Sequence, residues 1–234
     1  MSESEDKAIA PDEPAATVIL LRDGNAGLET LMLRRNSKLN FAGGLWVFPG
    51  GRVDPEDLSG LEEGDDCSAA RVCAAREAQE EAALSLAPER LIPFSHWTPP
   101  DESPRRFLTW FFLAAAPAGD VTIDQGEIHD HRWVSPAEGL SRVREGDIQV
   151  LPPTLVTLSE LEGFRSTDAA LSHFRTAPVE FFRTRIGLGS EGATALWEGD
   201  AGYDASDPAL DGPRNRLVMA KGHWVYDRSA ETRP

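Results

Sequence analysis

The chain has 234 residues, of which 41% are hydrophobic and 26% charged, so it can bury a core and is not a disordered chain. Its formal net charge of −16 repels polyanions and argues against nucleic-acid binding through the phosphate backbone. A small phosphorylated substrate is still compatible, because carboxylates hold Mg²⁺ and the ion attracts phosphates. The sequence lacks an apolar run of about 18 residues and begins with acidic residues, so we expect no membrane span or secretory signal and predict a cytoplasmic protein.

The first half of the chain is predicted to contain an acidic disordered tail, three strands, a loop and a helix. Runs of β-branched and apolar residues predict the strands, and a glycine-containing turn joins the first two as a hairpin. The alanine-rich segment after the loop favours a helix, for which Asp65 or Asp66 can serve as the N-cap. The predicted ranges are 1–14 for the tail, 16–22, 28–35 and 45–48 for the strands, 52–66 for the loop and 67–86 for the helix.

The second half continues with strands, then helices, then strands again. Ser135 followed by Pro136 and Glu138 predicts a helix start with a capping box. This order of elements predicts an α+β protein, an α/β/α sandwich in which a mixed sheet lies between helices. The predicted strands are 91–97, 107–115, 131–134, 179–186, 193–197 and a hairpin over 217–226 around Lys221-Gly222, and the further helices are 155–161 and 168–174.

Three glutamates in the predicted long helix are candidate metal ligands. Glu77, Glu80 and Glu81 stand at positions i, i+3 and i+4, which places them on one helical face. Carboxylates this close repel one another, a divalent cation removes that repulsion, and Mg²⁺ prefers such hard oxygen ligands. The alternative is an ordinary solvated acidic face, on which Arg76 forms a surface ion pair with Glu80.

The turn Phe48-Pro49-Gly50-Gly51 favours the metal-site interpretation. A strand ends here in a rigid turn with two small residues, which lets the backbone approach a ligand or metal closely. Together with the sequence Arg-Glu-Ala-Gln-Glu-Glu that begins at Arg76, this turn resembles the signature of the Nudix hydrolases. The signature runs glycine, five residues, glutamate, seven residues, then Arg-Glu-apolar-any-Glu-Glu-any-Gly-apolar, and residues 76–78, 80, 81 and 84 match it.

Two departures from that signature stand out. Ala83 occupies the place of the glycine after the paired glutamates. Gly51 and Arg76 are 25 positions apart (76 − 51), about 11 more than in an uninterrupted signature, so an insertion beginning at Arg52 splits it. Counting back from Arg76 places the first signature glutamate on Ser68. That role is either vacant or taken by an acid of the insertion, and the sequence leaves Asp54, Glu56 and Asp57 open.

A split signature resembles the Nudix branch of peroxisomal coenzyme A diphosphatases and their bacterial relatives. Residues 31–35, Gly44 and the Phe48–Gly51 turn fit the pattern of that branch, whereas Asn36 and Asn40 depart from it. The resemblance implies a diphosphatase that acts on coenzyme A, acyl-coenzyme A or a similar nucleoside diphosphate linked to another group. ADP-ribose, NADH and nucleotide sugars stay open as substrates, and a Nudix-fold binding domain without catalysis is the alternative from another class.

The resemblance also implies roles for individual residues. Mg²⁺ or Mn²⁺ would be bound by the three glutamates and the Gly50 carbonyl, with Arg76 holding the glutamates in place. Glu77 and Glu81 would act in catalysis, and Glu127 is a further candidate base. The candidate substrate contacts are Arg34, Arg35, Gly50 and Gly51. The Nudix domain would span 15–165 with its insertion at 52–66, and a β-rich extension over 166–234 would pack on it or continue it. A small phosphorylated substrate is the expected partner, and assembly into a homodimer is left open.

Overall fold

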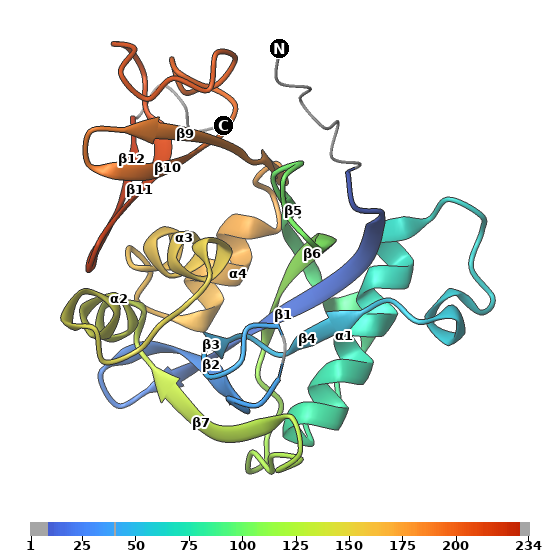
Figure 1. Ribbon diagram of the computed structural model, residues 1–234. Helices are drawn as coiled ribbons and strands as arrows, with labels where there is room; N and C mark the ends of the chain where they lie inside the picture. The colour runs from blue at the N-terminus through green and yellow to red at the C-terminus, as the bar shows by residue number, and fades with distance from the viewer. Residues whose placement is uncertain (1–8, 40, 230–234) are drawn as a thin grey trace.

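The computed structural model describes residues 9–39 and 41–229, which build two sheets and four α-helices (Figure 1). The main sheet has the strand order β3-β2-β1-β6-β5-β8, with β4 paired to β1 and β7 paired to β2. The pairs β1–β6 and β5–β8 are parallel and the others antiparallel, so the sheet is mixed as predicted. Its strands are β1 (Asp12–Gly24), β2 (Gly27–Arg35), β3 (Trp46–Val47), β4 (Gly50–Arg52), β5 (Ile92–Thr98), β6 (Arg106–Ala115), β7 (Ile128–Val134) and β8 (Glu180–Arg183).

Helices cover both faces of this sheet, which confirms the predicted α/β/α arrangement (Figure 1). The strand β1 shows why, because its neighbouring residues point to opposite faces and both sets are apolar. Val18 and Leu20 pack under α1, whereas Ile19 and Leu21 belong to the core on the opposite side. The helices are α1 (Asp66–Ala82) on one face and α2 (Pro136–Glu145), α3 (Pro152–Leu161) and α4 (Thr167–Phe174) on the other.

The helix α1 starts as predicted but ends four residues earlier than predicted. Asp65 is the N-cap, and its carboxylate accepts a hydrogen bond from the Ser68 backbone N–H. At the other end Ala83 adopts a left-handed conformation with φ 57°, and Leu84 N–H donates back to Ala78 O. Small residues on the sheet-facing side let α1 lie close to β1; they are Ala70, Cys73, Ala74, Ala78 and Ala82. Ala83, just beyond the end of the helix, is exposed.

The structure also corrects other details of the prediction. Residues 12–14 belong to β1, where Asp12 pairs with Arg106 of β6, although they were assigned to the tail; residues 1–8 of that tail lie outside the described residues. The predicted loop 52–66 contains a short 3₁₀ helix, η1 (Pro55–Leu58). The capping box at Ser135 is half formed, because Ser135 accepts from the Glu138 N–H while the Glu138 carboxylate pairs with Arg142. None of the helices in the described ranges is long and apolar enough to cross a membrane.

A second, antiparallel sheet follows the main one and packs against α3. Its strands are β9 (Arg185–Gly189), β10 (Gly192–Leu196), β11 (Asn215–Ala220) and β12 (His223–Arg228). The single strand predicted over 179–186 is two strands, because the chain leaves the main sheet after β8 and enters the second sheet at β9. Trp197 is fully buried in the main core beside Trp97 and Phe182. The predicted hairpin around Lys221-Gly222 is present, with Gly222 at φ +77°.

Candidate active site

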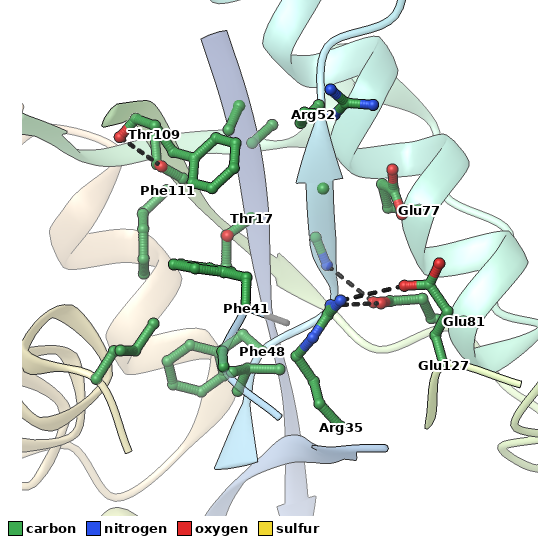
Figure 2. A pocket seen from close by; sticks show the side chains of 18 of the residues that line it. Thr17, Arg35, Phe41, Phe48, Arg52, Glu77, Glu81, Thr109, Phe111 and Glu127 are labelled. Carbon is green, nitrogen blue, oxygen red and sulfur yellow. Dashed lines mark hydrogen bonds and ion pairs between the residues drawn. The ribbon is translucent and has the colours of Figure 1, made fainter. Parts of the chain in front are cut away.

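A cavity of about 740 Å³ lies at one end of β1 and β4, between α1 and the N-terminus of α3. Figure 2 shows its two contrasting walls, with Glu77 and Glu81 on the side of α1 and Phe41, Phe48 and Phe111 on the other side of β4. The cavity is therefore acidic at one end and aromatic at the other.

The glycine turn brings β4 between β1 and the glutamates of α1, as the sequence indicated. A Cβ on Gly51 would lie 2.2 Å from Glu77 Oε1, and one on Gly50 would lie 2.4 Å from the Ala16 carbonyl oxygen. A side chain at Gly50 would therefore collide with the backbone of β1, and a side chain at Gly51 would displace the Glu77 carboxylate. Both glycines line the cavity.

Glu81 is the most deeply buried of the three glutamates. Its Oε2 accepts a hydrogen bond of 3.0 Å from the Gly50 backbone N–H, and its Oε1 lies 3.6 Å from Arg35 Nη1. Burial raises the pKa of Glu81 to about 8; the Gly50 N–H and Arg35 oppose this shift, and the negative charge of Glu77 adds to it. A bound cation would offset the cost of burial and favour the charged form of this carboxylate.

Arg76 binds the other two glutamates. Its Nη1 donates to Glu77 Oε1 at 2.9 Å and to Glu80 Oε2 at 3.0 Å. Burial raises the pKa of Glu77, Arg76 lowers it, and Glu80 and Glu127 raise it further. Among the described residues, no three acidic, histidine or cysteine side chains are arranged as a preformed metal site. Here the Gly50 N–H binds Glu81, whereas Arg76 binds Glu77. The donor chemistry nevertheless fits Mg²⁺, since these are hard oxygen ligands that repel one another and gain a partner in the ion.

The contacts of Arg76 distinguish the three acids that the sequence left open. Asp57, in η1, accepts two hydrogen bonds from the guanidinium, at 3.1 Å to Oδ1 and 2.9 Å to Oδ2. Asp54 lies 3.6 Å from Arg76 and is half exposed, and Glu56 is exposed. Ser68, the position found by counting, lies eight residues before Arg76 on α1, which is roughly 12 Å along a helix. Of the three acids left open, Asp57 is thus the one that makes hydrogen bonds to Arg76.

Of the two arginines predicted to contact substrate, one reaches this site. Arg35 lies 3.2 Å from Glu127 and shares the α1 side of β2 with Leu31 and Leu33. Arg34 points to the opposite face, as neighbouring strand residues do, and lines a separate hollow with Trp46 and Arg132. The prediction for Arg34 is therefore wrong with respect to this cavity. Glu127 also lines the cavity, with its side chain 59% exposed.

The comparison with known families matches this geometry. The model of the NUDIX domain matches residues 11–152, more than half of the chain and all of the acidic end of the cavity. This chain belongs to the Nudix family. A Caenorhabditis elegans protein whose name carries "nudix hydrolase 7" is 26% identical over 176 residues, which cover 59% of this chain and 57% of that protein. This chain thus spans little more than half of the length of the worm protein.

Solved structures agree on the fold. The crystal structure of a NUDIX hydrolase from Alicyclobacillus acidocaldarius superposes with a TM-score of 0.64 at 25% identity, covering 73% of this chain and 100% of that one. The NUDIX domain of Shewanella oneidensis NrtR, solved with ADP ribose, gives a TM-score of 0.49 at 17% identity over 68% of this chain and 96% of that one. The match of the NUDIX domain over residues 11–152 establishes the Nudix family, whereas the coenzyme A diphosphatase branch stays a prediction.

The aromatic end of this Nudix cavity was missed in the sequence. Phe107, Thr109 and Phe111 alternate along β6 and so share one face, and Phe41 meets Phe107 with ring centroids 5.1 Å apart. Phe111 and Phe112 are both buried, and Phe111 also lines the cavity. Alternation on β6 was the available signal, but the sequence alone does not say which face borders the site.

Proposed function

We propose that this Nudix protein is a divalent-metal-dependent hydrolase that cleaves a pyrophosphate linkage in a nucleoside diphosphate linked to another group. The observation that carries this proposal is the placement of Glu77, Glu80 and Glu81 at one end of a cavity whose other end is aromatic. A diphosphate fits the acidic end through a bound cation, and a planar base fits the aromatic end by stacking.

Each part of the acidic end has a proposed task. Glu77, Glu80 and Glu81 would hold Mg²⁺ or Mn²⁺, with the Gly50 carbonyl as a further predicted ligand. The ion, when bound, neutralises phosphate charge and lowers the pKa of a water molecule. Arg35 lines the cavity beside Glu81 and can donate to a phosphate oxygen there. Glu127, which accepts a hydrogen bond from Arg35, would accept a proton from the attacking water.

The cavity also bears on the substrate. A volume of about 740 Å³ accommodates a nucleotide-sized ligand. Stacking of a base on an aromatic side chain is worth roughly 1–3 kcal/mol, so Phe41 and Phe107 favour substrates with a base over simple diphosphates. The split signature and residues 31–35 support coenzyme A or acyl-coenzyme A among such substrates. ADP-ribose, NADH and nucleotide sugars carry the same chemical groups and belong to the same test.

The test is hydrolysis of a panel of coenzyme A, acyl-coenzyme A, NADH, ADP-ribose and a nucleoside triphosphate with Mg²⁺ or Mn²⁺. We expect turnover of at least one compound, and a loss of about a hundredfold or more in kcat for Glu80→Gln and for Glu81→Gln. Glu89→Gln, an exposed residue outside the cavity, is the matched control and should retain the wild-type rate. If the wild-type protein hydrolyses nothing in the panel, or if either Gln variant keeps the full rate, the proposal of a hydrolase is contradicted. Tight binding of a panel member without turnover would instead support a binding domain.

A further inference from the structure

The insertion that splits the signature carries a buried acid with an unusual set of contacts. The Asp57 side chain is only 2% exposed although its neighbours in η1 lie at the surface. Its Oδ2 accepts hydrogen bonds from the Asp54 backbone N–H and from Arg76, and its Oδ1 accepts from Arg76 Nε. We propose that Asp57 is a positioning residue that fixes the Arg76 guanidinium and, through it, the metal-binding carboxylates of α1. This inference rests on the proposed function.

Arg76 uses every hydrogen-bond donor of its side chain. An arginine side chain carries five N–H groups in a rigid plane. Here Nε and one N–H of Nη2 bind Asp57, the other N–H of Nη2 binds the Arg52 carbonyl oxygen at 3.0 Å, and Nη1 binds Glu77 and Glu80. Since all five groups have acceptors within the protein, Arg76 acts on the site through the glutamates and not by contact with substrate.

The paired contact with Asp57 sets the position of the guanidinium plane of Arg76. Two parallel bonds from one carboxylate fix both the place and the tilt of a guanidinium, which a single bond does not. Asp57 makes that paired contact from a buried position, whereas Glu80 has a 58% exposed side chain and can follow Arg76. The direction of Nη1, and thus where Glu77 and Glu80 are held, follows from Asp57. Burial opposes the charge of Asp57, yet the bonds from Arg76 and Asp54 lower its pKa, so it remains an anion.

No other acid of the insertion 52–66 is placed to make such a paired contact with Arg76. Asp54 lies 3.6 Å from Arg76, beyond hydrogen-bonding distance, and Glu56 is exposed at the surface of η1. Without Asp57, the guanidinium would lose two of its five bonds and turn toward the remaining carboxylates. Those carboxylates would then be tied up by Arg76 and hold a metal ion less well.

The experiment compares Asp57→Asn, Asp57→Glu and the control Glu56→Gln in the full chain. Mn²⁺ affinity is measured by electron paramagnetic resonance without substrate, and the Mg²⁺ dependence of the rate is measured on whichever panel compound is hydrolysed. We expect Asp57→Asn to weaken Mn²⁺ binding about tenfold or more and to raise the half-maximal Mg²⁺ concentration in parallel. The control should stay within about twofold, because it removes one charge from the same helix without touching Arg76.

The outcomes separate a positioning role from a merely structural one. If Asp57→Asn loses stability but binds Mn²⁺ with wild-type affinity, the proposal is overturned. If Asp57→Asn does not fold, Asp57→Glu keeps the charge with one more methylene and should still shift the Mn²⁺ affinity; an unchanged affinity in that variant overturns the proposal as well. An equal shift in Glu56→Gln would reduce the effect to general charge and also overturn it. Wild-type protein that binds Mn²⁺ but hydrolyses nothing contradicts the proposed function while leaving this test intact.

Discussion

Gly51 is the residue whose replacement best separates the site from the fold. In Gly51→Ala the new Cβ would stand 2.2, 2.5 and 2.9 Å from Oε1, Cδ and Oε2 of Glu77. These atoms are the far end of a flexible side chain, so the carboxylate can swing away at a cost of about 0.5–1.5 kcal/mol. The same movement takes Glu77 from its place beside Arg76. Because displacement of a catalytic group by about 1 Å can reduce a rate by roughly a hundredfold, we expect kcat to fall by that order.

Gly50 provides the comparison. Its added Cβ would stand 2.4 Å from the Ala16 carbonyl oxygen and 2.8 Å from Thr17 Cα, which are backbone atoms of the central strand β1. Backbone in a buried sheet cannot move aside in this way, so β4 must shift at a cost of about 1–3 kcal/mol. Gly50→Ala should therefore lose both stability and activity, whereas Gly51→Ala should lose mainly activity.

The assays are urea unfolding for the free energy of unfolding and initial rates at saturating Mg²⁺ for kcat. The expected pattern is a larger stability loss in Gly50→Ala and a hundredfold rate loss in Gly51→Ala with stability within about 1.5 kcal/mol of wild type. The reasoning is refuted if Gly51→Ala keeps the full rate, or if it unfolds more easily than Gly50→Ala.

Two further predictions concern the end of α1 and its most buried acid. Ala83→Gly should raise the free energy of unfolding by about 1 kcal/mol in urea titrations, because Ala83 has φ 57° and glycine adopts that conformation without strain; Ala82→Gly, one residue earlier inside the helix, should lower it. Glu81 has a pKa raised from 4.5 to about 8, so the folded state favours its protonated form and the resulting stability is complete below about pH 4.5. The metal-free protein should thus lose a few kcal/mol as the pH rises from about 5 to 8, and Glu81→Gln should flatten this profile; a flat profile in the wild type would contradict the assignment.

The local parts of the site could be predicted from the sequence because short-range rules govern them. Helical periodicity places Glu77, Glu80 and Glu81 on one face, and the two glycines mark where the backbone must come close. The N-cap Asp65 follows from the same kind of rule. These features depend on residues within a few positions of one another, and the structure confirms their placement.

The remaining features depend on contacts between distant segments. Asp57 meets Arg76 only because η1 folds back over α1, and counting along the chain pointed to Ser68 instead. Whether Arg34 or Arg35 faces the cavity depends on which side of β2 carries α1, which alternation alone does not reveal. The break in the predicted strand 179–186 has a similar origin, because the chain changes sheets at Thr184. There the Thr184 N–H donates to Thr98 O, and the Thr184 hydroxyl oxygen accepts from Trp197 Nε1.

The hydrogen-bonded attachment of the second sheet to α3 has a consequence for the shape of the cavity. Arg228 of β12 binds Glu160 of α3 and Glu180 of β8, while the first turn of the same helix, through Pro153 and Thr154, forms part of the cavity wall. The family match ends at residue 152, just as that helix begins. The acidic end of the cavity thus lies within the residues that match the family model. Part of the opposite wall is held in place by residues that follow the match. Changes in the last third of the chain can therefore reshape what the cavity admits without disturbing the residues that carry out the chemistry.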